Sequence, residues 1–175
     1  MILDMRPMLR GETSKIEIDF SLTPEPVDGA EFEGDARVVG AVVDQAGYMR
    51  LELDATVRYH AECARCLEPV HDSFSVSLER TVATKENLSE KQLEENVDEY
   101  AVIEDGRLDL GELMREELLL SFPMRFLCSD DCPGLCPKCG KPLRHGDCGC
   151  PKKEPDPRLA ILKTLLESQE GENKQ

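Results

Sequence analysis

Eight cysteines are the residues of this 175-residue chain whose type and spacing point to chemistry. Two pairs have the Cys-x-x-Cys spacing, Cys63 with Cys66 and Cys136 with Cys139, and the other four are Cys128, Cys132, Cys148 and Cys150. A Cys-x-x-Cys turn presents two thiolates to one ion, and zinc prefers four such ligands in a tetrahedron. The cysteines therefore predict zinc binding. Eight thiols suffice for two closed four-cysteine sites, although one zinc with spare thiols, or an iron–sulfur cluster, also fits the spacing.

The order of the cysteines suggests which of them share an ion. We expect Cys136, Cys139, Cys148 and Cys150 to form one local site. Cys63 and Cys66 would then share the second ion with Cys128 and Cys132, which would fasten the cysteine-rich segment to a distant part of the chain. The alternative is a zinc ribbon, in which the two Cys-x-x-Cys pairs bind one ion together.

The same residues argue against catalysis. A zinc ion held by four thiolates has no open position for water, and three histidines are too few for an open catalytic metal site. The sequence has no nucleophile–histidine–carboxylate pattern and no glycine-rich phosphate loop, so we expect no enzyme and no small-molecule substrate. Neither Cys-x-x-Cys pair follows a strand and opens a helix, which disfavours a thioredoxin-like redox site.

Cysteines at metal-binding spacing are typical of a reducing compartment. No apolar run approaches the ~20 residues that cross a bilayer, and the first residues lack the basic and apolar regions of an export signal. We therefore expect a cytoplasmic protein without a membrane partner, whose thiols stay reduced and available for metal.

Charge is unevenly distributed along the chain. The net charge is −15, which disfavours an extended nucleic-acid-binding surface. Residues 125–163 nevertheless hold eight basic and five acidic side chains, while the rest of the chain has a net charge of −18. The candidate RNA-contacting residues are Lys138, Lys141, Arg144, Lys152 and Lys153. A competing explanation is that these cations offset the formal −2 charge of each zinc–thiolate site.

The elements that must position the cysteines are mostly strands. Apolar residues alternate with charged ones at 16–20, and residues 37–43 form a β-branched run broken by Gly40. The clearest strand is 51–63, in which every second residue is apolar or small, and the alternation resumes from 70 to 82. The short connection that contains Cys63 and Cys66 predicts an antiparallel hairpin.

Two helices and an acidic insert complete the expected fold. Residues 85–106 are acidic and predict a solvated helix or loop, or alternatively an acidic docking surface. Asp109 and Glu112 predict a capped helix near 109–122, and Asp156 with Pro157 predicts a terminal helix. The fold class is thus α+β, with an antiparallel β-rich domain covered by a helix (1–124) and a cysteine-rich zinc module with a C-terminal helix (125–170).

Four segments of the sequence resemble the YceD-like large ribosomal RNA subunit accumulation family. They are Cys63-Ala-Arg-Cys66-Leu-Glu-Pro69, the segment from Leu108 to Pro123, the segment from Cys132 to Leu143, and Asp156-Pro-Arg-Leu-Ala-Ile-Leu162. The resemblance implies a bacterial cytoplasmic protein, with relatives in chloroplasts, that acts in the synthesis, processing or stability of large-subunit (23S) ribosomal RNA. Some relatives lack the later cysteines, which implies that zinc supports the architecture rather than a shared activity.

The resulting hypothesis is a non-catalytic ribosome-biogenesis factor. Its partner would be a basic ribosomal protein, held by the acidic body, or large-subunit rRNA, contacted by the basic tail. The alternatives are a zinc-ribbon transcription regulator or another zinc-stabilised protein-interaction module, and a metal-storage or redox protein. The acidic body offers no recognition element for duplex DNA, which argues against the regulator.

Overall fold

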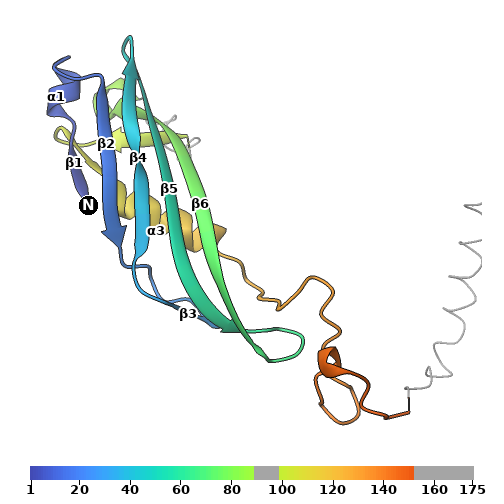
Figure 1. Cartoon of the computed structure of the whole chain (residues 1–175). Helices are drawn as coiled ribbons and strands as arrows, with labels where there is room; N and C mark the ends of the chain where they lie inside the picture. The colour runs from blue at the N-terminus through green and yellow to red at the C-terminus, as the bar shows by residue number, and fades with distance from the viewer. Residues whose placement is uncertain (89–98, 152–175) are drawn as a thin grey trace, which may run out of the picture. The chain divides into compact units, whose positions relative to one another are not determined.

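A computed structural model of the chain describes residues 1–88 and 99–151 (Figure 1). The chain divides into two compact units, Met1–Cys132 and Pro133–Gln175. The helix expected from Asp156, the candidate residues Lys152 and Lys153, and the middle of the acidic insert lie outside the described residues. Within the described ranges, no helix is both long enough and apolar enough to span a membrane.

A mainly antiparallel sheet forms most of the first unit. Its strands lie in the order β2-β4-β5-β6-β7, and the short strand β3 pairs with β5. The strands are β2 (Lys15–Leu22), β3 (Ala30–Phe32), β4 (Ala36–Gln45), β5 (Tyr48–Glu62), β6 (Pro69–Thr84) and β7 (Tyr100–Ile103). Neighbours run antiparallel except β6 and β7, which are parallel. The α+β class and the β-rich domain are therefore confirmed.

The predicted hairpin is the longest feature of the sheet. β5 and β6 pair from Met49 opposite Val82 to Glu62 opposite Pro69. Every second residue of β5 from Leu51 to Ala61 is buried, and the residues between them face solvent apart from the half-buried His60. The alternation read from the sequence thus gives the correct buried face. The register places residues 63–68, called here the hairpin tip, beyond the last strand pair.

Helix α3 (Leu110–Ser121) lies across one face of the sheet, where a helix near 109–122 was expected (Figure 1). The Asp109 side chain caps it by accepting a hydrogen bond of 3.0 Å from the Glu112 backbone N–H. Leu110, Met114 and Leu118 are buried against the sheet. An ion pair of 3.1 Å between Arg80 of β6 and Glu117 adds a polar contact at the edge of this interface.

The acidic insert (85–106) contains a strand that the sequence interpretation missed, and a second strand follows it. Instead of a solvated helix or loop, residues 100–103 form β7, and directly after the insert Arg107–Asp109 form β8, which pairs with β1 (Ile2–Asp4). The apolar residues Ala101, Ile103 and Leu108 are buried, and they explain why this part of an acidic segment folds. Helix α1 (Arg6–Leu9), which buries Met8, was also not expected. Two short 3₁₀ helices are η1 (Lys85–Asn87) and η2 (Leu143–His145).

A group of aromatic side chains lies between the sheet and the segment that leaves α3. The ring of Phe122 lies 4.9 Å from that of Phe32, 5.2 Å from Tyr59 and 5.2 Å from Phe74. Phe126 continues the group, with its ring 5.3 Å from Tyr59. Offset and edge-on contacts of this kind add to the hydrophobic gain of burial. They hold residues 122–126 against β5, and so direct the following residues to the hairpin tip.

Gly40 interrupts the β-branched run of β4 because the neighbouring backbone comes too close for a side chain. A Cβ atom at this position would lie 2.0 Å from the Glu52 carbonyl oxygen and 2.9 Å from the Leu53 Cα. Both atoms belong to the backbone of β5 and cannot move aside cheaply.

We therefore expect Gly40→Ala to lower the free energy of unfolding by about 2 kcal/mol, as overpacking commonly does. Urea denaturation followed by circular dichroism would measure the change. Ala41→Ser, in the same strand but on the half-exposed face, is the control and should change stability by less than about 0.5 kcal/mol. Equal stability of the two variants would contradict the steric explanation.

Candidate metal centre

The first cysteine group begins at the hairpin tip. Two backbone hydrogen bonds shape the turn, from the Leu67 N–H to the Cys63 carbonyl (2.9 Å) and from the Cys63 N–H to the Glu68 carbonyl (2.8 Å). These bonds curl the chain so that the side chains of Cys63 and Cys66 point to the same side, and both residues are buried. The alternation of β5 sets this position, because Cys63 follows the buried face of the strand.

The segment after the aromatic group supplies the other two sulfurs of this site. The Ala64 N–H donates to the Phe126 carbonyl (2.9 Å), which aligns the two segments just before Cys128. The Arg65 guanidinium then donates two hydrogen bonds through Nη1, to the carbonyls of Asp130 (3.0 Å) and Cys132 (2.9 Å). Arg65 therefore fixes the loop that carries Cys132 to the turn that carries Cys63 and Cys66.

The sulfur positions fit a tetrahedral metal ion. The four sulfurs lie within 4.8 Å of one another, with Cys63 Sγ 3.8 Å from Cys132 Sγ and Cys66 Sγ 3.6 Å from Cys128 Sγ. Four ligands at the zinc–sulfur distance of about 2.3 Å stand about 3.8 Å apart at the corners of a tetrahedron. All eight cysteines are free thiols rather than disulfides. The described site thus has the ligand type, number and spacing of a closed zinc site.

Backbone amides prepare one thiol of this site for metal. Burial raises the pKa of the Cys63 thiol, but hydrogen bonds from the backbone N–H groups of Cys128, Arg65 and Cys66 outweigh burial and lower the pKa to about 6. The Glu68 backbone N–H lowers the pKa of Cys66, yet burial and the neighbouring sulfurs raise it to about 12. Since a thiolate is the ligand form, Cys63 is ionised at neutral pH before metal arrives, and the close sulfurs oppose a second ionisation without a cation.

The second cysteine group lies wholly within the second unit. Cys136, Cys139, Cys148 and Cys150 have sulfurs within 4.8 Å of one another. Hydrogen bonds from the Gly140 N–H to the Cys136 carbonyl (2.8 Å) and from the Cys136 N–H to the Lys141 carbonyl (2.9 Å) repeat the turn of the first site. The backbone N–H groups of Cys139 and Lys138 lower the pKa of Cys136 to about 6, whereas hydrogen bonding with Cys139 and Cys148 raises that of Cys150 to about 12.

The structure gathers the eight cysteines into the two groups of four that the sequence favoured. Each Cys-x-x-Cys pair belongs to a different group of four, whereas the zinc-ribbon alternative would place both pairs in one group. Of the candidate RNA-contacting residues, Lys138, Lys141 and Arg144 are exposed on the second unit. Arg65 is a positioning residue that the sequence interpretation missed. Its place inside a Cys-x-x-Cys turn was the available signal, because a side chain there can reach the chain segment that supplies the other ligands.

Comparison with known proteins gives a family and several relatives. The family model described as "Large ribosomal RNA subunit accumulation protein YceD" matches residues 51–166, from β5 through both cysteine groups. An uncharacterised protein of Mycobacterium tuberculosis is 37% identical over 105 residues, which cover 60% of this chain and 49% of that protein. An uncharacterised protein of Mycobacterium leprae is 33% identical over 106 residues (61% and 48%), and the uncharacterised protein YlbN of Bacillus subtilis is 36% identical over 70 residues (39% and 41%).

The chain thus spans about half the length of the curated relatives that it matches. No solved structure matches it significantly.

The geometry predicts two metal sites that fill independently. Cys66→Ser should reduce bound zinc from two ions per chain to one, and Cys139→Ser should do the same, because each variant removes a ligand from a different group. Elemental analysis of the purified proteins would count the ions, and cobalt substitution would report tetrahedral thiolate ligation. Loss of both ions in either single variant would contradict two separate sites.

Metal removal should loosen the loop that Arg65 holds. A chelator is expected to increase trypsin cleavage after Arg65 by at least tenfold, because its side chain is then released from the carbonyls of Asp130 and Cys132. Peptide mass spectrometry over a time course would measure the rate. Cleavage after Arg10 is the internal control and should not change, because Arg10 lies in an exposed turn near the N-terminus, far from Arg65 in the sequence. An unchanged rate at Arg65 would show that the loop holds without metal.

Proposed function

Because the chain belongs to the family of the large ribosomal RNA subunit accumulation protein YceD, we propose that it is a non-catalytic factor in the synthesis, processing or stability of 23S ribosomal RNA. The observation that carries the proposal is the extent of the family match. It begins at Leu51, within β5, and it includes the hairpin tip, α3 and both cysteine groups. The segment that identifies the family is thus the segment that the metal sites would organise.

Zinc has a structural role in this proposal. When bound by four thiolates, zinc supplies a cross-link without an open position for substrate or water. The residues of the chain do the remaining work: the buried thiols of Cys63 and Cys66 hold the hairpin tip, and Arg65 holds the loop beyond it. The proposal places the protein in the cytoplasm, where ribosomal RNA is made and thiols stay reduced.

The second unit is the part of the chain best suited to touch RNA. Between residues 133 and 151 the basic side chains are Lys138, Lys141 and Arg144, and the single acidic one is Asp147. The three basic side chains are exposed, and among residues 133–151 only Gly134 and Cys136 are buried. Exposed lysine and arginine bind phosphates by releasing counterions, which makes such binding sensitive to salt. The excess of acidic residues in the first unit disfavours a second RNA contact there.

The proposed function predicts a specific loss of large-subunit RNA. Deleting the gene should lower 23S rRNA relative to 16S rRNA, and the protein should co-sediment with large-subunit precursors in sucrose gradients. The full-length gene should restore the ratio. A normal 23S:16S ratio in the deletion strain, together with no co-sedimentation, would refute the proposal.

The RNA contact has a separate test in purified protein. Replacing Lys138, Lys141 and Arg144 together by glutamine should reduce the salt dependence of binding to a 23S fragment, with a slope of log K against log salt that falls by about 2. The matched control replaces Lys15, Arg37 and Lys85, three exposed cations of the first unit that form ion pairs with acidic neighbours. Equal slopes for the two triple variants would place the RNA contact elsewhere.

A further inference from the structure

The two Cys-x-x-Cys turns share one backbone design, which makes the residue after each pair directly comparable. In the first turn, Leu67 donates to the carbonyl of Cys63. In the second turn, Gly140 donates in the same way to the carbonyl of Cys136. Leu67 and Gly140 therefore occupy equivalent positions, and both have left-handed backbone conformations, with φ of 62° and 72°.

Leucine is an unexpected residue at this position. A positive φ places the Cβ atom of any residue other than glycine close to its own backbone, so glycine is favoured and branched, bulky side chains are rare. Burial does not compensate Leu67, because 59% of its surface is exposed. Neither the turn nor the core therefore requires leucine here. A strained residue that folding does not explain suggests a functional contact.

Leu67 lines a groove of about 790 Å³ beside the hairpin tip. Met124 lines the same groove from the segment after α3, and its side chain is fully exposed. Ala61 and Phe126, which are buried together with Tyr59 and Phe122 in one apolar cluster, also line the groove. Two large apolar side chains thus stand exposed around a groove whose volume lies in the range of sites that bury a ligand group.

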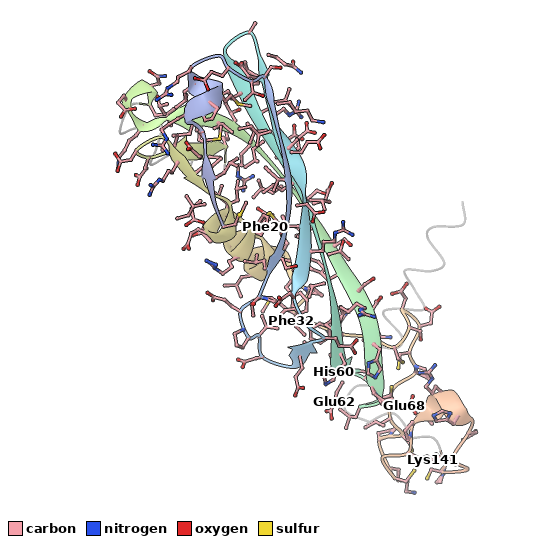
Figure 2. All side chains as sticks on the ribbon, turned by 60° about the vertical axis from the view of Figure 1, so that its left-hand side comes forward. Phe20, Phe32, His60, Glu62, Glu68 and Lys141 are labelled. Atoms are coloured by element: carbon pink, nitrogen blue, oxygen red, sulfur yellow. The ribbon has the colours of Figure 1, made fainter. Side chains whose placement is uncertain are left out.

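The charged residues of the groove are mainly acidic. Asp28, Glu31 and Glu62 line it together with a single arginine, Arg125. His60 also lines the groove, and its Nε2 lies 3.2 Å from the Glu31 carboxylate. Figure 2 shows His60 and Glu62 close to the tip, near the end of β5. Three carboxylates around an apolar groove complement a ligand that combines positive charge with an apolar side chain.

We propose that this groove, called here the tip groove, is a docking site for an extended segment of a basic protein. An apolar side chain of the partner packs between Leu67 and Met124, and flanking lysine or arginine side chains pair with Glu31, Glu62 and Asp28. RNA fits the tip groove less well, since the carboxylates repel phosphate. Of the two aromatic rings that line it, Phe126 is 7% exposed and presents little surface for base stacking, and the His60 ring lies against the Glu31 carboxylate. The biological context of such a partner, ribosome assembly, rests on the proposed function, whereas binding of a basic segment to the tip groove does not.

Fluorescence anisotropy with the zinc-loaded chain tests the proposal directly. The probe is a fluorescein-labelled peptide, Lys-Lys-Arg-Leu-Ile-Arg-Lys-Lys. We expect Leu67→Gly to weaken probe binding by about tenfold, as withdrawal of one apolar side chain from a contact does, and Met124→Ser to weaken it similarly. Leu120→Ser is the matched control, because Leu120 is 79% exposed but does not line the tip groove. Its affinity should equal that of the unaltered chain.

The choice of glycine separates docking from a structural role. Glycine suits the left-handed turn better than leucine, so Leu67→Gly should keep two zinc ions and the same melting temperature or a higher one. Leu67→Asn, which also tolerates this conformation, should lose probe binding to the same degree. Unchanged probe affinity in Leu67→Gly would overturn the proposal, and so would loss of zinc from this variant, because leucine would then serve the turn itself.

The nature of the ligand is tested in the same assay. An unlabelled oligouridylate should not displace the probe, and its displacement of the probe in a Leu67-dependent manner would replace the protein ligand by RNA and overturn the proposal. The result is independent of the proposed function, which is judged by the 23S:16S ratio in the deletion strain. Probe binding with a normal ratio and no co-sedimentation would refute the proposed function alone, and a lowered ratio without probe binding would refute the tip groove alone.

Discussion

The first unit depends on a link between two chain segments that lie far apart in the sequence. Cys63 and Cys66 stand at the end of a long hairpin, and their partners Cys128 and Cys132 follow more than sixty residues later. Within residues 63–68 only the two cysteines are buried, so apolar burial contributes little there. Closing so long a loop costs entropy that grows slowly with length, while a four-thiolate ion supplies a large binding free energy at one point. The fold lowers the remaining cost before metal binds, because the Phe122–Phe126 segment packs on β5.

The features that the sequence predicted well are those encoded by local pattern. The alternation in 51–63 identified the buried face of β5, and Asp109 with Glu112 identified the start of α3. The grouping of the cysteines was favoured over a zinc ribbon but did not follow from spacing, because Cys128 and Cys132 lie closer in sequence to the second pair than Cys148 and Cys150 do. Features that depend on distant pairing were missed. β7 is only four residues long and forms a strand because it pairs in parallel with β6. No local pattern in an acidic segment reveals this pairing.

The role of Arg65 was missed for a related reason. Its sequence context places it in a turn between two ligands, where an exposed cation would be ordinary. Its two acceptors are backbone carbonyls of residues 130 and 132, and carbonyl groups leave no trace in the sequence. Leu67 differs, because the comparison of the two turns is available from the sequence alone: glycine follows one pair and leucine follows the other. The sequence difference becomes informative only with the φ angle of each residue, which shows that the position is left-handed in both turns.

Rigidity connects the metal site with the tip groove. Binding an extended segment costs the ordering of that segment, and the cost rises further if the receptor surface must also be ordered. Cys63 lines the groove, Leu67 follows within the same turn, and Pro69 begins β6 directly after it. An ion bound by the four thiolates would fix the backbone that presents these residues. The closed four-thiolate geometry is suited to this task, because it supplies stiffness without reactivity beside a surface that must stay open to a partner. A hydrophobic plug at the tip could give the same stiffness only by burying the apolar side chains that docking needs exposed.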